Sequence, residues 1–297
     1  MEHTGLDEFW NEVRDIDIKA MQIVYDGNEV YLYDRYNGQR QNQYSITKSI
    51  TSAAAGLAMQ ERIFTLDDPV DWYIREAKEK RGMIRDIKIR HLLNMTQGFE
   101  RPLLMGSERK RLCEKDWVSY VCSCPVVHQP GTVFQYNNAG PYLLGVIIQR
   151  ATGKDLIDYL MPRLFEPLEI ARPCAEKCPM GYVFGAGGIK LNIRELGRFG
   201  QLYLQKGMWK KRQIISGKWI EQSASVKSYP AIDDSRCGGY GYLFWINSDG
   251  SYMAKGKGGQ FCIIVPEKKT VVSINSNAEE ASDRIYDAVK SRIISQL

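Results

Sequence analysis

Strand-like segments lie near both ends of this 297-residue chain, and a long helical stretch separates them. Residues 21–33 form two apolar runs joined at Asp26-Gly27-Asn28, which is a strong signal for a β-hairpin. Beyond residue 237, further strand-like runs follow one another closely, divided by glycine-rich or proline-containing breaks. Closely spaced strands pair as antiparallel neighbours, so the pattern predicts one antiparallel sheet that takes strands from both ends of the chain.

Helices are expected on the outside of this sheet and between its two halves. Residues 4–19 are amphipathic, and residues 278–297 repeat apolar side chains at a spacing of four. The long stretch between the strand-rich ends is mainly helical and rich in loops. The predicted fold class is therefore α+β. Residues 1–60 and 185–297 are predicted to form a sheet domain flanked by the N- and C-terminal helices, and residues 61–184 an inserted, mainly helical domain. The active site is expected at the junction of the two domains.

The first helix after the hairpin opens with Tyr44-Ser45-Ile46-Thr47-Lys48 and continues through a run of alanines. On a helix, Ser45 and Lys48 share one face, with roughly 5–6 Å between their Cβ atoms. A serine hydroxyl is a poor nucleophile until an adjacent base takes its proton, and a lysine amine at this spacing can act as that base. The motif is short, and a second copy at residues 107–110 lies in a charged segment typical of a solvated surface. The alternative interpretation of the helix is a core element with an unrelated serine and lysine.

The composition is that of a soluble globular protein and argues against several other classes. Apolar residues make up 44% of the chain, charged residues 25%, and the net charge is +5. Acidic residues interleave with the short basic clusters, which favours solvated faces over a nucleic-acid groove. No stretch approaches the ~20 apolar residues of a membrane span, so neither nucleic acid nor a membrane is an expected partner. The acidic N-terminal segment does not resemble a signal peptide, so a cytoplasmic location is expected unless an export signal has been trimmed away.

Neither a metal nor a cofactor is expected. The seven cysteines are an odd number without regular spacing, and the pairs Cys122/Cys124 and Cys174/Cys178 lack the Cys-x2-Cys pattern of zinc sites. The three histidines are scattered along the chain, and His91 is expected to be a packed or surface residue of a short helix. Free thiols in a reducing compartment are the simpler interpretation of the cysteines.

Two further elements follow the Ser45-x-x-Lys48 motif along the chain: Tyr136-Asn137-Asn138 and Lys257-Gly258-Gly259. Taken singly, a packed tyrosine, a solvated strand lysine and a flexible glycine turn would explain them. In the order Ser-x-x-Lys, Tyr-x-Asn, Lys-x-Gly, the chain resembles the serine penicillin-recognising enzymes, specifically the branch of class C β-lactamases, D-alanyl-D-alanine carboxypeptidases and related esterases. The resemblance covers nearly the whole chain and includes Gly185-Ala186-Gly187-Gly188.

The resemblance implies a β-lactamase-like fold and a role for each motif residue. Ser45 would attack a carbonyl, and either Lys48 or the Tyr136 phenolate would take its proton. Tyr136 would then protonate the leaving group and activate the deacylating water. Asn138 would orient Lys48 and the substrate amide, and Lys257, on a strand beside the site, would supply positive charge.

The same resemblance implies an oxyanion hole and reveals departures from the family pattern. The backbone N–H groups of Ser45 and Gln260 would bind the oxyanion, while Gly258 and Gly259 would let the substrate lie close to the strand. Position 258 is glycine where β-lactamases usually carry Thr or Ser, which weakens carboxylate binding and puts efficient β-lactam turnover in doubt. The segment between Leu168 and Gly185 is short where relatives carry a long loop, which implies an open cleft.

The sequence therefore predicts a serine hydrolase that forms an acyl-enzyme at Ser45 and acts on a small ester, amide or β-lactam. The first alternative is a β-lactamase or D-alanyl-D-alanine carboxypeptidase-like enzyme. The second alternative is a non-turning-over penicillin-binding or ligand-sensing protein, because binders can keep the motifs intact. The sequence alone leaves the oligomeric state open.

Overall fold

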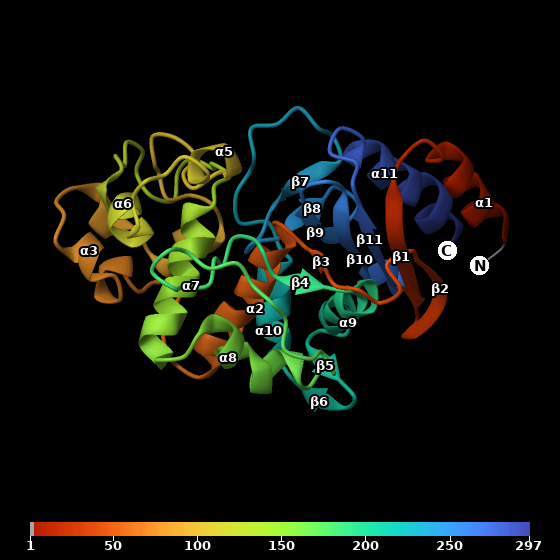
Figure 1. The fold of residues 1–297 in the computed structure, drawn as a ribbon, viewed down its shortest axis with the longest axis horizontal. Coiled ribbons are helices and arrows are strands. Elements are labelled where there is room, and N and C mark those ends of the chain that lie inside the picture. Colours follow the sequence, from red (N-terminus) through yellow and green to blue (C-terminus); the bar gives the residue numbers. More distant parts are fainter. Residues whose placement is uncertain (1–2) are drawn as a thin grey trace.

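The computed structural model describes residues 3–297, so Met1 and Glu2 of the predicted sheet domain lie outside the described residues. Its main feature is a seven-stranded antiparallel sheet in the order β2-β1-β11-β10-β9-β8-β7 (Figure 1). The strands are β1 (Ile18–Tyr25), β2 (Asn28–Asp34), β7 (Cys237–Tyr240), β8 (Trp245–Asn247), β9 (Tyr252–Gly256), β10 (Gln260–Val265) and β11 (Thr270–Ser276). The predicted sheet with strands from both chain ends is thus confirmed.

The two ends of the chain join where β1 pairs with β11. Met21 lies opposite Ile274, so the first and last strands of the chain are neighbours inside the sheet. The predicted hairpin is also present, with Tyr25 opposite Asn28. Asp26 and Gly27 between them both have positive φ, of 45° and 82°, which is the conformation that a two-residue hairpin turn of this sequence demands.

Successive side chains of the central strands point to opposite faces of the sheet, where they belong to two separate apolar cores. On β10, Phe261 and Ile263 face the terminal helices, α1 (His3–Glu12) and α11 (Ser282–Ala288). Cys262 and Ile264 face the opposite side, which is covered by α2 (Ile46–Gln60) and α9 (Ile193–Leu204). Every residue of β10 is buried, as expected for a central strand covered on both faces.

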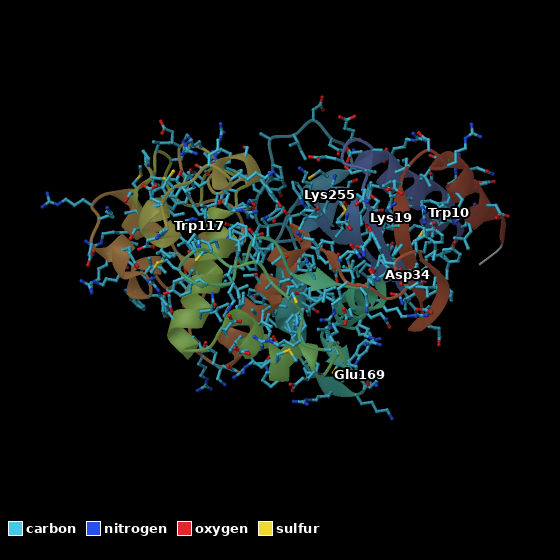
Figure 2. All side chains as sticks on the ribbon, viewed as in Figure 1. Trp10, Lys19, Asp34, Trp117, Glu169 and Lys255 are labelled. Atoms are coloured by element: carbon cyan, nitrogen blue, oxygen red, sulfur yellow. The ribbon has the colours of Figure 1, made fainter. Side chains whose placement is uncertain are left out.

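A mainly helical region forms the other half of the molecule (Figure 1). Trp117, which packs edge-on against Tyr142 and Phe184, lies in this half, away from Trp10 near the N-terminus (Figure 2). Its helices are α3 (Arg75–Lys78), α4 (Ile89–Leu93), α5 (Gly106–Arg109), α6 (Trp117–Ser123), α7 (Ala139–Thr152) and α8 (Leu156–Leu160). The remaining elements are α10 (Gly217–Ser223) and the short pairs β3 (Gln41–Asn42) with β4 (Lys190–Leu191), and β5 (Met208–Trp209) with β6 (Arg212–Gln213). The division into residues 1–60 with 185–297 and residues 61–184 stays a prediction.

Helix α2 connects the two halves, packing against both α7 and the strands β9 and β10. All its residues from Ile46 to Ala58 are buried. Small side chains make this possible: a Cβ added at Gly56 would lie 2.3 Å from the Trp219 ring, so only glycine lets the indole approach the helix so closely. The helix that carries the Ser-x-x-Lys motif is therefore fixed by contacts on every side.

The terminal helices differ from the sequence-based boundaries. The first helix ends at Glu12 rather than near residue 19, because the chain must enter β1 at Ile18. The last helix is α-helical only from Ser282 to Ala288 and continues as a π-helical turn over Val289–Ile293. A similar π-turn, Met161–Phe165, ends α8. Within residues 3–297, no helix is both long and apolar enough to cross a bilayer.

Candidate active site

Ser45 occupies the N-cap position of α2, immediately after a residue in an unusual conformation. Tyr44 has a positive φ of 44°, which is rare for an aromatic residue. Its backbone N–H donates to the Asn42 side-chain oxygen at 2.8 Å, and this bond helps to hold the turn. Such left-handed conformations cost free energy and persist where the surroundings impose them. Here the turn leaves Ser45 partly exposed at the end of a buried helix.

Lys48 lies directly behind Ser45, as the motif predicts. Its ammonium nitrogen is 2.9 Å from Ser45 Oγ and 2.8 Å from the Ala186 carbonyl oxygen. The Lys48 side chain is 1% exposed. Burial, with a further contribution from the charge of Arg109, lowers the pKa of Lys48 to about 7. A substantial fraction of this amine is therefore neutral at physiological pH and able to accept a proton.

The segment 185–189 docks on α2 through a row of side chains that sequence analysis did not assign. Thr51 Oγ1 donates to the Gly185 carbonyl at 2.7 Å, and the Ile189 N–H donates to Thr47 Oγ1 at 3.1 Å. Between these bonds, the Ala186 carbonyl accepts from Lys48. The family-like run Gly185-Ala186-Gly187-Gly188 was the available signal, and its structural role is to bring this carbonyl to the lysine.

Tyr136 lies beside the serine–lysine pair, in the extended segment that leads into α7. The Lys48 ammonium is 5.0 Å from the centre of the Tyr136 ring. The ring stacks on Trp245, with centroids 5.7 Å apart, and meets Tyr240 edge-on. Burial raises the pKa of Tyr136 to about 12, although interaction with the Ser45 side chain opposes the rise. At neutral pH Tyr136 is thus a phenol rather than a phenolate.

Asn138 lies near these residues, but its amide points elsewhere. Its Nδ2 donates to the Leu104 carbonyl at 2.8 Å, and its backbone N–H donates to the Leu103 carbonyl. The hydrogen bonds that the described residues form with the Lys48 ammonium are those to Ser45 and Ala186. The proposed orientation of Lys48 by Asn138 therefore remains a prediction, while the observed role of Asn138 is to fix the loop that precedes α5.

Lys257 departs from expectation, because it lies in a turn and not on a strand. Strand β9 ends at Gly256, which pairs with Gln260 at the start of β10, so residues 257–259 form the connection. The Lys257 side chain is 60% exposed, and its ammonium lies 2.9 Å from Glu279 Oε1. This ion pair raises the pKa of Lys257 and keeps the side chain cationic.

The alternation of side chains along β9 explains which of its residues face α2 and which do not. Ala254 belongs to the core on the α2 side, and a Cβ added at Gly256 would lie 2.6 Å from the Gln43 carbonyl just before Ser45. Lys255 points to the other face, where it donates to Asp283 of α11 at 2.9 Å. Ala254 and Gly256 therefore face α2, whereas Lys255 and Lys257 lie at the edge of the site.

The glycines and Gln260 of the same turn have distinct environments. Gly258 and Gly259 both have positive φ, of 79° and 77°. Gln260 is 3% exposed, and its side-chain amide donates to the Ser276 carbonyl on β11. The turn thus has a rigid base, and its outer residues, Lys257 and Gly258, face the site.

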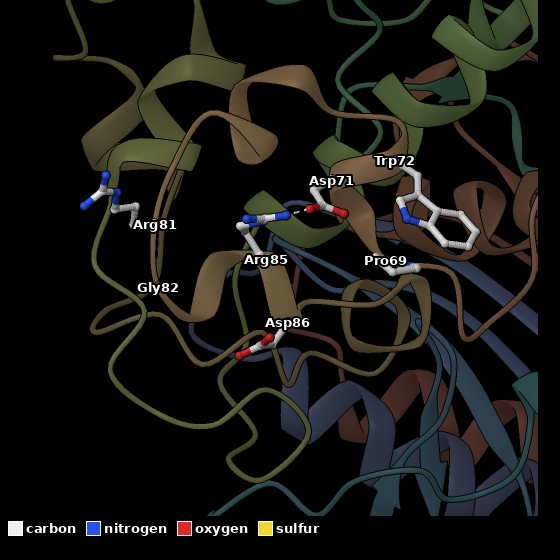
Figure 3. A pocket seen from close by; sticks show the side chains of 7 residues that line it. All are labelled: Pro69, Asp71, Trp72, Arg81, Gly82, Arg85 and Asp86. Atoms are coloured by element: carbon white, nitrogen blue, oxygen red, sulfur yellow. Dashed lines mark hydrogen bonds and ion pairs between the residues drawn. The ribbon is translucent and has the colours of Figure 1, made fainter.

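A pocket of about 250 Å³ opens beside the nucleophile. Its lining comes from α2, the segment before α7, the β8–β9 and β9–β10 region and the start of α11: Ser45, Tyr136, Trp245, Lys255, Gly256, Lys257, Gly258, Glu279 and Ser282. A larger hollow of about 550 Å³ lies on the helical half, where Arg85 pairs with Asp71 at 3.1 Å (Figure 3). The larger hollow shares no lining residue with the Ser45 pocket, and the chemistry described above belongs to the smaller one.

The chain's match to a known family agrees with this geometry. The Beta-lactamase family model matches residues 20–295. The chain belongs to the Beta-lactamase family. Ser45, Lys48 and Tyr136 of the predicted motifs lie close together, whereas Lys257 lies in a turn.

Proteins similar to this chain include a curated hydrolase and two solved structures. A curated 6-aminohexanoate-dimer hydrolase of Paenarthrobacter ureafaciens is 25% identical over 170 residues, covering 54% of this chain and 43% of the hydrolase. The octameric penicillin-binding protein homologue of Pyrococcus abyssi has a TM-score of 0.77 at 22% identity, covering 96% of this chain and 75% of its own. EstCE1, a hydrolase with promiscuous acyltransferase activity, has a TM-score of 0.75 at 15% identity, covering 96% of this chain and 98% of EstCE1.

The matched part of this chain spans less than half the length of the curated hydrolase. The similarity to the solved structures, at identities below 25%, supports the fold. Together with the family match, it confirms the predicted β-lactamase-like α+β architecture.

Arg109 is a residue near the site that sequence analysis missed. It ends α5, stacks 4.1 Å above the centre of the Phe184 ring and lies 3.4 Å from Glu176. Its charge contributes to the lowered pKa of Lys48. The segment around Ser107, interpreted from sequence as a solvated surface, thus places one cation close enough to affect Lys48, and no periodic pattern signals this.

The other polar candidates have structural surroundings. Within residues 3–297, no group of three or more His, Cys, Asp or Glu side chains is arranged to hold a metal ion, and all seven cysteines are free thiols. His91 Nδ1 accepts from the Lys88 N–H at 3.1 Å and so caps α4. Burial lowers the pKa of His91 to about 4 and keeps the imidazole neutral.

Proposed function

We propose that this protein is a serine hydrolase that forms an acyl-enzyme at Ser45 and hydrolyses small esters or amides. The observation that carries the proposal is the 2.9 Å contact between Ser45 Oγ and the buried Lys48 amine. In acylation, a bond forms between Ser45 Oγ and the substrate carbonyl carbon while the serine proton passes to Lys48 Nζ. The bond to the leaving group then breaks as that group takes up a proton, and water later releases the acyl group.

Lys48 is the better candidate for the general base. A catalytic base works best when its pKa lies near the working pH, and the pKa of Lys48 is about 7. The Tyr136 phenolate is scarce at neutral pH, because burial raises the pKa of Tyr136 to about 12. As a phenol beside Ser45, Tyr136 is suited to protonate the leaving group, and the proton that Lys48 took from Ser45 then restores the phenol. It can then orient the water that attacks the acyl-enzyme.

The oxyanion is expected to bind backbone N–H groups at the pocket's inner wall. Ser45 N–H supplies one donor at the start of α2. Lys257 lines the pocket with Ser45, whereas Gln260 is buried below the turn. This placement favours the Lys257 N–H as the second donor over the Gln260 N–H inferred from sequence. Gly258, beside it, leaves room for substrate.

The relatives support an ester or amide substrate without fixing its identity. Those relatives are a hydrolase of an aminohexanoate dimer and a hydrolase with acyltransferase activity. The main alternative is a β-lactamase or D-alanyl-D-alanine carboxypeptidase-like activity. The structural similarity to the penicillin-binding protein homologue is consistent with this alternative. A non-turning-over penicillin-binding or ligand-sensing role is the other alternative. Membership of the class C branch and a cytoplasmic location are part of the proposal.

A substrate panel with active-site labelling tests the proposal. The purified protein is assayed with short-chain p-nitrophenyl esters and a chromogenic cephalosporin, and its fluorophosphonate adduct is mapped by mass spectrometry. We expect ester turnover to exceed cephalosporin turnover and the adduct to lie on Ser45. Ser107→Ala should label normally, and Ser45→Ala should not. A stable adduct without turnover would favour the binding role, while faster cephalosporin hydrolysis would favour the β-lactamase.

A further inference from the structure

The mouth of the Ser45 pocket is lined by two lysines, and each is paired with a carboxylate. Lys257 lies 2.9 Å from Glu279, and Lys255 lies 2.9 Å from Asp283. Glu279 itself lines the pocket beside Lys257. Both carboxylates come from the end of the chain, on α11 or the residues just before it, where the helix approaches the β9–β10 turn.

This pairing changes what Lys257 can offer to a substrate. A substrate carboxylate beside Ser45 would need a cation, and the Lys257 ammonium already faces Glu279 Oε1. An incoming anion would have to displace Glu279 and then remain close to its negative charge. Lys255, which also lines the pocket, is likewise engaged, because its ammonium donates to Asp283. An uncharged acyl group does not have to displace Glu279 and is not repelled by its charge.

We propose that Glu279 is a specificity-determining residue, which engages Lys257 and directs the pocket toward esters and amides whose acyl group is uncharged. The inference rests on the proposed function, because it concerns the substrate of the Ser45 acyl-enzyme. It predicts selection against carboxylates through an internal ion pair at the mouth, and not through the residue type at position 258 alone.

The ion pair is exposed, and this sets the size of the expected effect. The Lys257 and Glu279 side chains are 60% and 65% exposed, so water and salt screen their interaction. We therefore expect a modest selectivity of about two- to fivefold. We also expect it to shrink as the salt concentration rises.

The test compares matched p-nitrophenyl esters: neutral butyrate, anionic hemisuccinate and a quaternary-ammonium acyl ester. Glu279→Gln should raise the anionic-to-neutral ratio of kcat/KM about two- to fivefold and lower the cationic-to-neutral ratio. Glu280→Gln is the control, because it makes the same charge change at an exposed neighbour outside the pocket lining. Adding Lys257→Gln to Glu279→Gln should remove the gain for the anionic ester.

The outcomes separate this inference from the proposed function. If the wild-type protein hydrolyses the neutral ester but Glu279→Gln leaves both ratios unchanged, the role of Glu279 is wrong and the hydrolase assignment stands. An equal shift in Glu280→Gln would likewise overturn it, because the effect would then be one of general surface charge. If no ester is turned over and Ser45 is not labelled, the proposed function itself fails.

Discussion

Lys48 shows how one buried side chain can decide the chemistry of the site. In water its amine would be almost fully protonated at pH 7 and could not take a proton from serine. Removing the side chain from water penalises the charged form, and the nearby Arg109 adds repulsion, so the pKa falls to about 7. The same burial leaves Ser45 Oγ and the Ala186 carbonyl as its hydrogen-bond partners.

A direct consequence is a pH dependence of acylation. The neutral fraction of the Lys48 amine increases as the pH rises. The rate of fluorophosphonate labelling at Ser45 should therefore increase with pH, with a midpoint at about 7, and level off at higher pH. Lys48→Arg should reduce labelling about 10²- to 10⁴-fold, since a guanidinium stays protonated at any working pH. Lys154→Arg, at an exposed position after α7, is the matched control.

The same assay distinguishes the two motif lysines. Lys257→Arg should retain partial activity, because this side chain remains cationic in the wild-type protein and lies exposed at the rim. If Lys257→Arg lost as much labelling as Lys48→Arg, or if the wild-type rate stayed flat between pH 5 and 9, the assignment of Lys48 as the base would have to be abandoned.

Residue identities near Ser45 were predictable because the Ser-x-x-Lys spacing is local. A helix fixes the geometry of residues three apart, so the 2.9 Å contact follows from the motif once α2 forms. Arg109 and the Ala186 carbonyl could not be found in this way. They reach Lys48 through tertiary folding, over long separations in sequence, and no periodic pattern records that approach.

At the level of elements, the turn between β9 and β10 shows where sequence interpretation failed. Alternation along a continuous strand would place Lys255 and Lys257 on the same face. Instead, Gly256 pairs with Gln260, and the residues between them leave the strand. The failure concerns register and turn position, which depend on two adjacent glycines with positive φ and not on the hydrophobic pattern.

This turn yields a prediction about stability. Gly259 has a φ of 77°, and an added Cβ would lie 2.4 Å from Ser276 Oγ. Gly250 has a similar φ of 81°, but nothing lies within 4 Å of its Cβ position. Gly250→Ala should therefore cost only the backbone strain, about 1 kcal/mol, and Gly259→Ala should cost about 1–3 kcal/mol more. Urea unfolding of the two variants measures the difference, and equal losses would show that the Gly259 contact relaxes freely.

At the level of the whole molecule, the sheet separates the catalytic side from a second core. Strand positions and the joining of the chain ends were predictable, because hairpin signals and apolar runs are local features. The ends of the helices were not, since the π-turns after α8 and within the last helix depend on packing. The terminal helices α1 and α11 cover the face opposite α2, and Phe9 is fully buried there.

The last prediction uses this separation of faces. Phe9→Ala leaves a cavity between α1 and the sheet and should lower the free energy of unfolding by about 3–5 kcal/mol. Trp72→Ala, which removes an aromatic side chain that is 70% exposed, should change it by less than about 0.5 kcal/mol. Because Phe9 packs on the face away from Ser45, labelling of the folded Phe9→Ala variant should keep the wild-type rate and pH dependence. A large loss of labelling below the unfolding transition would show instead that the terminal helices hold the catalytic face in place across the sheet.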